Sequence, residues 1–260
     1  MMSLKGEERK EKILEILDLR EKVTVNELSR KLGVSTETIR RYLEQLERAH
    51  KVRKVYGGAI RVSDQEPALM SREVKYLEEK KRIGKKAAEH VLDNDVIAID
   101  EGSTPLHMIP YLSDKKNITV ITNSFPAAYL LIEKKNNQLF DGEIIFLGGV
   151  VHAEHQRISG SYALSMMEHF YVNKAFITVD GISKQDGVTC YDNEKGMLSK
   201  KMMSQAEQSI VVVDHSKFDV RSMHKLAALN DIHTIISDQE MPRQWISKHL
   251  KFTANWVVAD

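Results

Sequence analysis

Residues 35–46 read Ser-Thr-Glu-Thr-Ile-Arg-Arg-Tyr-Leu-Glu-Gln-Leu, a stretch with one apolar stripe and one polar face. The apolar residues Ile39, Leu43 and Leu46 recur at i, i+4 and i+7, a spacing that predicts an amphipathic helix. The other face opens with hydroxyl side chains and continues with two adjacent arginines, Arg40 and Arg41. A helix in an enzyme core has no need of that arrangement.

The residues on either side of this helix predict a helix-turn-helix with a wing. A shorter helix over 27–32 comes first, and Asn26 is placed to cap it. Gly33 ends that helix at the position that favours a left-handed backbone. Two short helices joined by a tight glycine turn are typical of a helix-turn-helix. The basic stretch 51–62, with a turn at 57–58, predicts a β-hairpin wing.

The distribution of charge indicates that this head meets a polyanion. Residues 1–62 carry 15 Lys and Arg against 10 Asp and Glu, whereas residues 63–260 carry 23 against 27. Such a basic head on a mildly acidic body is typical of nucleic-acid binding. We expect the second helix to enter the major groove and the wing to follow the phosphates, although surface arginines on a solvated helix are the simpler alternative. The predicted DNA-binding residues are Ser35, Thr36, Thr38, Arg40, Arg41, Lys51, Arg53, Lys54 and Tyr56.

Composition excludes several other classes of protein. The chain has 260 residues with 42% apolar and 29% charged residues, which is ordinary for a folded domain pair. No apolar run reaches the roughly 18 residues that a membrane helix needs, and the first residues lack the apolar core of a signal peptide. The single cysteine, Cys190, excludes an internal disulfide framework. We therefore expect a cytoplasmic protein without membrane association.

Beyond the head, continuous β-branched runs alternate with helical segments. Such alternation predicts a mostly parallel sheet covered by helices on both faces. The fold class is therefore α/β, with an N-terminal winged helix-turn-helix and a larger C-terminal, mostly parallel α/β domain. The predicted strands are 96–99, 118–121, 144–147, 175–179, 210–213, 232–236 and 256–258.

The segment between head and body is polar and charged, and it predicts the domain boundaries. Residues 63–67 are polar and contain Pro67, which interrupts the wing, and a charged helical pattern follows. We assign 1–62 to the DNA-binding domain, 63–80 to a linker and 81–260 to an effector domain.

Polar loops follow several of the predicted strands, where ligands bind in open α/β sheets. The loop 100–104, Asp-Glu-Gly-Ser-Thr, opens a helix, so that small residues, hydroxyls and a helix N-terminus converge there. Asn123, Asp180 and Lys217 follow other strands. Carboxylates accept hydrogen bonds from sugar hydroxyls, while lysines and backbone amides hold phosphate. This combination suits a small phosphorylated polyol.

The sequence is identified as a member of a known family by its motifs. Residues 23–59, with Leu-Gly-Val-Ser, Thr-Ile-Arg-Arg and basic residues before Gly-Gly-Ala, resemble the N-terminal domain of the DeoR family of bacterial sugar-operon repressors. The body order Asp-x-Gly-Ser-Thr, Thr-Asn-Ser, Leu-Gly-Gly, Asp-Gly-Ile and Asp-x-Ser-Lys-Phe resembles that family's effector domain, which is similar in fold to ribose-5-phosphate isomerase. Two residues depart from the family pattern: Tyr42 stands where an Asp is common, and Glu101 where a small residue is common.

The resemblance implies a function and completes the site. It implies a repressor of a sugar or polyol operon, with operator DNA and a phosphorylated sugar or sugar alcohol as partners. A homodimer or homotetramer without a cofactor is expected, and the chain is not expected to be an enzyme. The resemblance adds Asp180, Lys200 and Lys217 to the pocket. The expected effector-binding residues are then Asp100, Gly102, Ser103, Thr104, Asn123, Asp180, Lys200 and Lys217.

Two other functions remain open at this point. One is a sugar-phosphate isomerase that carries a DNA-binding head, and the other is a DNA-binding scaffold without a small ligand. The run His-Ala-Glu-His at 152–155 has histidines three apart, but it lies in a predicted loop without further ligands, so we expect no metal. Cys190 lacks a neighbouring base, so we expect no catalytic residue.

Overall fold

The chain forms two compact units. In the computed structural model, residues 4–19, 22–49, 51–55, 57–61, 66–246 and 253–260 are described. The units are Met1–Gln65 and Glu66–Asp260. Residues 66–80, which the sequence suggests as part of a linker, belong to the second unit.

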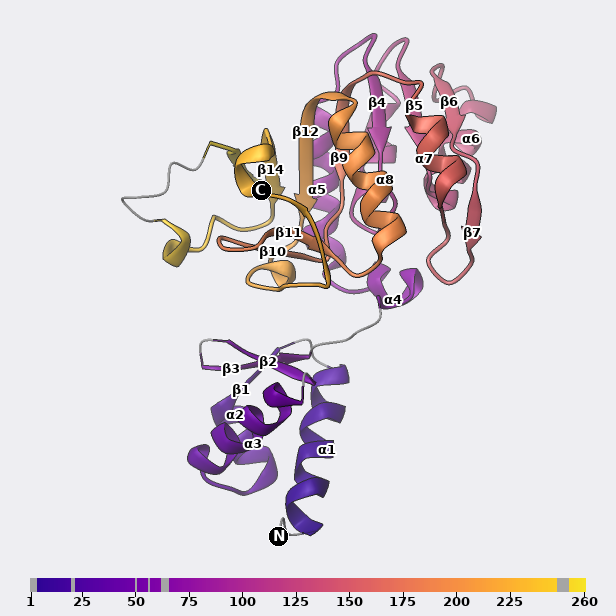
Figure 1. Ribbon diagram of the computed structural model, residues 1–260. Helices are drawn as coiled ribbons and strands as arrows, with labels where there is room; N and C mark the ends of the chain where they lie inside the picture. The colour runs from indigo at the N-terminus through magenta and orange to yellow at the C-terminus, as the bar shows by residue number, and fades with distance from the viewer. Residues whose placement is uncertain (1–3, 20–21, 50, 56, 62–65, 247–252) are drawn as a thin grey trace. The chain divides into compact units, whose positions relative to one another are not determined.

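The first unit is a winged helix-turn-helix, as predicted (Figure 1). Its strands form an antiparallel sheet in the order β1-β3-β2. Helix α3 follows α2 across a short turn and packs against the wing strand β2. The elements are α1 (Leu4–Leu19), β1 (Lys22–Thr24), α2 (Val25–Leu32), α3 (Thr36–Arg48), β2 (Val52–Val55) and β3 (Gly58–Arg61).

Local chemistry sets the ends of the two central helices of this unit. The prediction that Asn26 caps α2 is wrong, because Thr24 is the cap: its Oγ1 accepts from the Glu27 amide at 3.2 Å, and the Glu27 carboxylate accepts from the Thr24 amide at 2.9 Å. This reciprocal pair is a capping box. Gly33 ends α2 with φ 61°, the left-handed conformation expected for it. Ile39 lies on α3 and is fully buried in the core of the unit.

The second unit is built on a seven-stranded sheet in the order β15-β14-β12-β9-β4-β5-β6. Every neighbouring pair in it is parallel, which confirms the predicted sheet. The sheet strands are β4 (Val96–Ile99), β5 (Thr119–Thr122), β6 (Glu143–Phe146), β9 (Val172–Ile177), β12 (Ala206–Val213), β14 (Thr234–Ser237) and β15 (Asn255–Val258).

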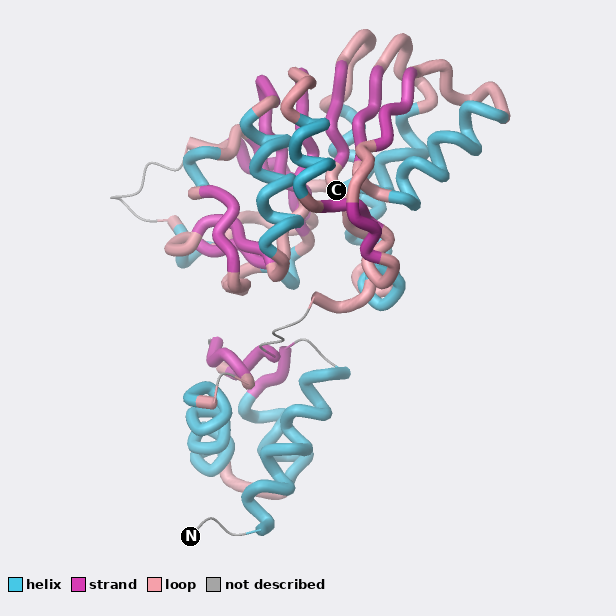
Figure 2. Tube along the Cα trace, turned by 45° about the vertical axis from the view of Figure 1, so that its right-hand side comes forward, coloured by secondary structure: helices cyan, strands magenta, loops and turns pink. Residues whose placement is uncertain are grey.

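Helices and short strands fill the crossovers, and helices alternate with strands along the chain (Figure 2). The helices are α4 (Leu69–Glu73), α5 (Leu77–Glu89), α6 (Phe125–Asn136), α7 (Ser161–Met167), α8 (Asn193–Ser204) and the 3-10 helices η1 (Pro105–Leu112), η2 (His215–Lys217), η3 (Leu229–Asp231) and η4 (Arg243–Trp245). The short strands are β7 (Val150–His152), β8 (Arg157–Ser159), β10 (Gly181–Ser183), β11 (Gly187–Cys190) and β13 (His224–Ala227).

The two faces of the large sheet bury two separate cores. Along β4, Ile97 and Ile99 face one core, while Ala98 between them faces the other. Helices α5, α6 and η1 cover the first face, and α7 and α8 cover the second. In Figure 1, α8 lies in front of the sheet and α5 behind it. Burial on both faces explains why the strands read as continuous apolar runs.

Some elements were not anticipated from the sequence. β7 and β8 pair as an antiparallel hairpin where a loop was expected, and β10, β11 and β13 form a small separate sheet. The predicted helix after residue 104 is the 3-10 helix η1, which has Pro110 inside it. Within the described ranges, no helix combines the length and apolarity that crossing a bilayer requires.

Close packing of α5 on η1 holds the loop that leads into η1. A Cβ built on Gly84 would lie 2.4 Å from the carbonyl carbon of His107, so the two backbones approach as only glycine permits. Because η1 begins directly after residues 100–104, this contact fixes one end of the predicted ligand loop.

We expect Gly84→Ala to destabilise the second unit although alanine is the better helix former. The propensity gain of about 1 kcal/mol is opposed by an overpacking cost of about 1–3 kcal/mol. Urea unfolding followed by tryptophan fluorescence measures this, because both tryptophans, Trp245 and Trp256, lie in this unit. Lys85→Ala, at an exposed neighbouring position, is the control and should change little. A Gly84→Ala protein as stable as this control would contradict the packing argument.

Candidate functional site

The N-terminus of α3 presents the hydroxyl side chains predicted to face DNA. Ser35 caps the helix: its Oγ accepts from the Thr38 amide at 3.2 Å and lies 2.9 Å from the Thr38 hydroxyl. These two hydroxyls therefore close the first turn of α3. Thr36, half-buried, begins the helix between them.

Basic side chains continue along α3 and onto the wing. Arg40 and Arg41 are exposed. Arg40 Nη1 lies 3.4 Å from a Glu37 carboxylate oxygen, and the Arg41 guanidinium carbon lies 5.9 Å from the centre of the Tyr42 ring. The Tyr42 ring belongs to the core of this unit, so an aromatic residue here supports the helix that carries both arginines.

The wing adds exposed Lys51 and Lys54, and Lys54 Nζ lies 3.2 Å from a Glu44 carboxylate oxygen. A groove between α3 and the wing is lined by Asn26, Arg40, Glu44 and Lys54 among others. The structure thus brings α3 and the wing together around one basic groove. Of the other wing predictions, Tyr56 lies outside the described residues, and the Arg53 side chain is not described either.

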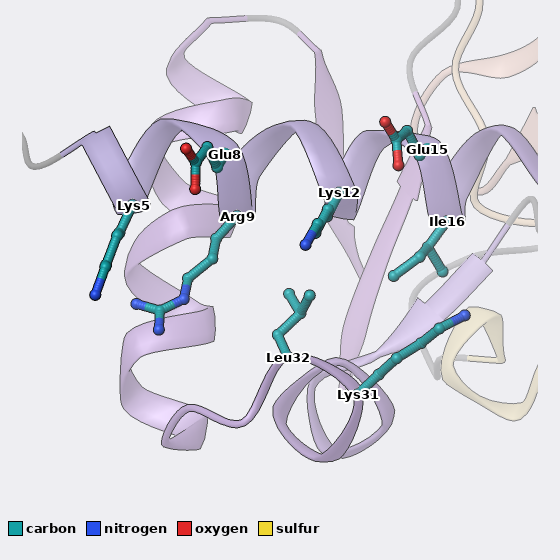
Figure 3. A pocket seen from close by; sticks show the side chains of 8 residues that line it. All are labelled: Lys5, Glu8, Arg9, Lys12, Glu15, Ile16, Lys31 and Leu32. Carbon is teal, nitrogen blue, oxygen red and sulfur yellow. The ribbon is translucent and has the colours of Figure 1, made fainter.

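A second basic hollow of about 600 Å³ lies between α1 and the end of α2. In Figure 3, the side chains of Lys5, Arg9 and Lys12 extend from α1 toward α2. The Leu32 side chain points from the end of α2 back toward α1. Glu8, Glu15 and Lys31 also line it, so cations outnumber carboxylates four to two. The positive charge predicted for the head therefore covers more than the recognition helix.

In the second unit, the carboxyl ends of the strands meet as expected. Asp100 follows β4, Asn123 follows β5 and Asp180 follows β9, and all three side chains are buried. Helix α8 begins nearby, because Lys195 in its first turn donates to Asp180 at 3.0 Å. These strand ends therefore form one site rather than separate loops.

At this site, six charged side chains form a nearly solvent-free cluster, which we call the charge cluster. It contains three carboxylates and three cations, and their side chains are at most 11% exposed. Its members are Glu66, Arg72, Glu101, Arg157, Asp180 and Lys195.

Lys195 and Glu101 occupy the middle of the charge cluster. Lys195 Nζ lies 3.0 Å from carboxylate oxygens of Glu66, Glu101 and Asp180 alike. Glu101 also pairs with Arg157 at 3.2 Å and Arg72 at 3.5 Å. Equal numbers of opposite charges compensate one another here, as buried charges require.

The cluster shifts the pKa values of its two central members strongly. Burial opposes ionisation of Glu101, but Lys195, Arg72 and Arg157 outweigh burial and hold the pKa of Glu101 well below its usual range. Burial also opposes the charged form of Lys195, yet Asp180, Glu101 and Glu66 raise its pKa well above the ordinary value. Glu101 and Lys195 are therefore both charged at neutral pH.

Asp100 behaves differently, although it lies next to the cluster. Burial and the neighbouring Glu101 carboxylate raise the pKa of Asp100 to about 7. Its side chain accepts from the Ser199 hydroxyl at 2.8 Å and from the Glu101 amide at 2.9 Å. Asp100 is therefore a buried group that exchanges a proton near neutral pH.

The predicted ligand loop, residues 100–104, keeps its backbone close to the end of β9. Gly102 has φ 136°, and a Cβ there would lie 2.7 Å from the Thr178 methyl carbon, so this position requires glycine. Ser103 and Thr104 are buried directly after it. Asn123 donates to the Ile158 carbonyl at 3.0 Å, which ties the β5 loop to β8.

The two lysines predicted for the pocket lie in different surroundings. Lys217, in η2, is half-buried; burial opposes ionisation of Asp180, but Lys195, Arg72 and then Lys217 outweigh it and lower the pKa of Asp180. Lys200 is exposed on α8 and stands apart from the charge cluster, whereas Lys195 on the same helix is fully buried within it. The structure therefore brings Lys195, and not Lys200, into the charge cluster.

Five members of the charge cluster are not among the residues that the sequence predicts for the site: Glu66, Arg72, Glu101, Arg157 and Lys195. Glu101 departs from the family pattern in the loop 100–104, so part of the signal is present in the sequence. A search for complementary charges near strand ends could have joined Glu101 with its cationic partners.

Histidines and the cysteine have other surroundings. His152 Nε2 lies 2.7 Å from the Ser159 hydroxyl, and His155 Nδ1 lies 4.0 Å from Glu66. Among the residues that the structure describes, no three His, Cys, Asp or Glu side chains are grouped so as to hold a metal ion. Burial raises the pKa of Cys190 to about 12, which keeps it a thiol at neutral pH.

Two family models together match most of the chain. Residues 9–65 match the DeoR-like helix-turn-helix domain, and residues 75–239 match the DeoR C-terminal sensor domain. The HTH-type transcriptional repressor GlcR of Bacillus subtilis (strain 168) is 35% identical over 92% of this chain and 90% of its own. The L-fucose operon activator of Haemophilus influenzae is 30% identical over 90% and 92%. A solved D-ribose-5-phosphate isomerase with phospho-erythronic acid gives a TM-score of 0.40 at 20% identity, over 55% of this chain and 54% of that one.

The winged helix-turn-helix joined to a sensor domain defines a DNA-binding transcriptional regulator. The chain belongs to the DeoR family, as the resemblance in the sequence implied. The relatives named here are regulators rather than enzymes.

The raised pKa of Asp100 predicts a specific pH dependence of stability. The folded protein keeps a proton on Asp100 that the unfolded chain releases between about pH 4 and pH 7, so the free energy of unfolding falls as pH rises through this window. Relative to that of Asp100→Asn, the free energy of unfolding of the unsubstituted protein should fall by up to about 1.4 kcal/mol per pH unit. Urea unfolding of both proteins, followed by tryptophan fluorescence at several pH values, measures the difference. A difference that is constant across the window would contradict the raised pKa.

Proposed function

We propose that the chain represses a sugar or polyol catabolic operon in the cytoplasm, and that a phosphorylated sugar bound in the second unit controls its binding to operator DNA. The observation that carries this proposal is the charge cluster at the carboxyl edge of the sheet. Three buried cations meet there beside a glycine-containing loop, in a chain whose other unit binds DNA.

The chemistry of the cluster suits a phosphate and a polyol together. Arginine and lysine bind phosphate oxygens through charge-assisted hydrogen bonds, and carboxylates accept from sugar hydroxyls. Among the described residues, Arg72 Nε and Arg157 Nε are buried donors without a hydrogen-bond acceptor, and Asn123 Oδ1 is a buried acceptor without a donor. Such unmet groups are costly unless a ligand satisfies them. The proposed effector-binding residues include Asp100, Gly102, Ser103, Thr104, Asn123, Asp180 and Lys217, with Lys195 in place of Lys200.

The names of the relatives support a sugar-related role. One relative is a repressor and another is the activator of an L-fucose operon. The proposal that this chain is a repressor rests on the motifs of its head. The proposal that its effector is a sugar phosphate rests on the cations of its sensor unit.

Operator binding would use α3 in the major groove and the wing along the phosphates. Ser35 and Thr38 would act by fixing the helix start, while Thr36, Arg40 and Arg41 reach the DNA, with Lys51, Arg53, Lys54 and Tyr56 on the wing. A homodimer or homotetramer would place two such helices on successive half-sites, about 34–36 Å apart.

Arg41→Ala should weaken binding to the chain's own upstream DNA about tenfold or more, because Arg41 is exposed on the groove-facing helix. Fluorescence anisotropy at several salt concentrations measures the loss. If Arg41 contacts a phosphate, the slope of log K against log salt should also fall by about one. Arg221→Ala removes an equally exposed arginine from the second unit and serves as the control. Equal binding by both variants would refute the assigned DNA-binding face.

A panel of sugar phosphates added to the protein–DNA complex tests the effector. We expect one member among glycerol, hexose and hexitol phosphates to change DNA affinity at fixed salt. A ligand shifts the equilibrium between two states of the protein only if it binds them with different affinities. Lys217→Ala should weaken this response about tenfold, since Lys217 is half-buried close enough to influence Asp180. Lys200→Ala should leave the response nearly unchanged, because Lys200 is exposed.

The same samples, assayed for turnover, separate the regulator from an isomerase. A panel without any effect on DNA binding would refute the sugar-phosphate effector, and conversion of a sugar phosphate would support the isomerase instead.

A further inference from the structure

The segment that joins the two units places a carboxylate inside the charge cluster. Glu66 is the first residue of the second unit, and only residues 62–65 separate it from the end of β3 at Arg61. Its side chain is 3% exposed. The chain therefore enters the sensor unit through the candidate ligand site itself.

Glu66 contacts all three cations of the cluster. One carboxylate oxygen lies 2.9 Å from Arg72 Nη1 and 3.0 Å from Lys195 Nζ, and the other accepts from Arg157 Nη1. A carboxylate held by two guanidinium groups and an ammonium group is bound as a phosphate would be. Glu66 thus occupies the place of an anionic ligand.

The balance of charge shows why Glu66 and a phosphate exclude each other. With Glu66 in place, three carboxylates compensate three cations. Adding a phosphate to this buried, compensated cluster would bury uncompensated negative charge, which is strongly unfavourable. If Glu66 leaves, the cluster carries one net positive charge and gains the space that its carboxylate filled.

Of the three carboxylates, Glu66 is the one whose departure the fold permits. Glu101 is held through its carbonyl, which accepts from the Thr178 hydroxyl at 2.7 Å, and Asp180 accepts from the Tyr191 amide at 3.1 Å. Glu66 instead precedes α4 outside any helix or strand.

We propose that Glu66 is a built-in competitor of the effector: the phosphate of the ligand displaces the Glu66 carboxylate from Arg72, Arg157 and Lys195. This displacement releases the segment that connects to the DNA-binding unit. The inference rests on the proposed control by a phosphorylated effector, and it adds the residue that sets effector affinity and transmits occupancy to the head.

Glu66→Gln tests the competition, because it keeps the shape of the side chain and removes its charge. Calorimetric titration of the full-length protein with inorganic phosphate and with glucose 6-phosphate should show affinity about tenfold or more above that of the unsubstituted protein. Glu154→Gln is the matched control, since it removes the same charge from an exposed side chain whose backbone carbonyl bonds the Leu69 amide. Glu66→Asp keeps the charge on a shorter side chain, so its affinity for these ligands should lie between those of Glu66→Gln and Glu154→Gln. It covers the case in which Glu66→Gln folds poorly.

Hydrogen exchange of the unsubstituted protein distinguishes displacement from a simple gain of positive charge. Saturating phosphate or glucose 6-phosphate should speed exchange in peptides that cover residues 66–76, including the Leu69 amide. In Glu66→Gln these peptides should already exchange fast, and the ligand should add little.

The outcomes separate this inference from the proposed function. If the unsubstituted protein responds to a sugar phosphate while Glu66→Gln binds with unchanged affinity, or if residues 66–76 become better protected on binding, the competition is overturned and the effector stands. If neither protein binds any phosphate compound, both the effector class and the competition are overturned.

Discussion

Compensation of buried charge is the constraint on which the sensor unit depends. Three carboxylates and three cations meet where the strands end, and none of them could be buried there alone. The cluster joins residues far apart in the chain, because Glu66 pairs with Arg157 91 positions later and with Lys195 129 positions later. Charge therefore ties Glu66 to the β8 hairpin and to helix α8, which also share an apolar core through Ile158 and Leu198.

The sheet makes this cluster possible by excluding water from the strand ends. Its two faces bury separate cores, with α5 and η1 on one and α7 and α8 on the other. The close approach at Gly84 fixes η1, and the loop with Gly102 then presses against Thr178 of the neighbouring strand end. A low-dielectric site of this kind strengthens every charge–charge interaction within it. The same packing raises the pKa of Asp100, which has no cation bonded to its carboxylate in the described structure.

The head follows simpler rules, and local sequence accounts for most of it. Thr24 and Ser35 cap their helices, Gly33 adopts the left-handed conformation between them, and Ile39 anchors α3 in the core. The two caps and the glycine turn depend on neighbours within a few positions along the chain, and the helical period of the apolar residues marks Ile39 as a buried position. Even the misplaced cap at Asn26 was an error of two residues, because Thr24 and Asn26 both suit a helix start and only the Glu27 side chain decides between them.

The sequence by itself determined the two-part organisation, the helix-turn-helix, the positions of the parallel strands along the chain and the loops at 100–104, 123 and 180, because periodicity and glycine placement act locally. It did not determine which lysine of α8 is buried: Lys195 and Lys200 are five residues apart, which turns them about 140° around the helix axis, and only the packing of α8 against the sheet chooses the buried face. Nor could it show that Glu66, within a polar connecting segment, lies among Arg72, Arg157 and Lys195. Pairing between distant side chains leaves no periodic trace in a single sequence, so tertiary structure alone decided the composition of the site.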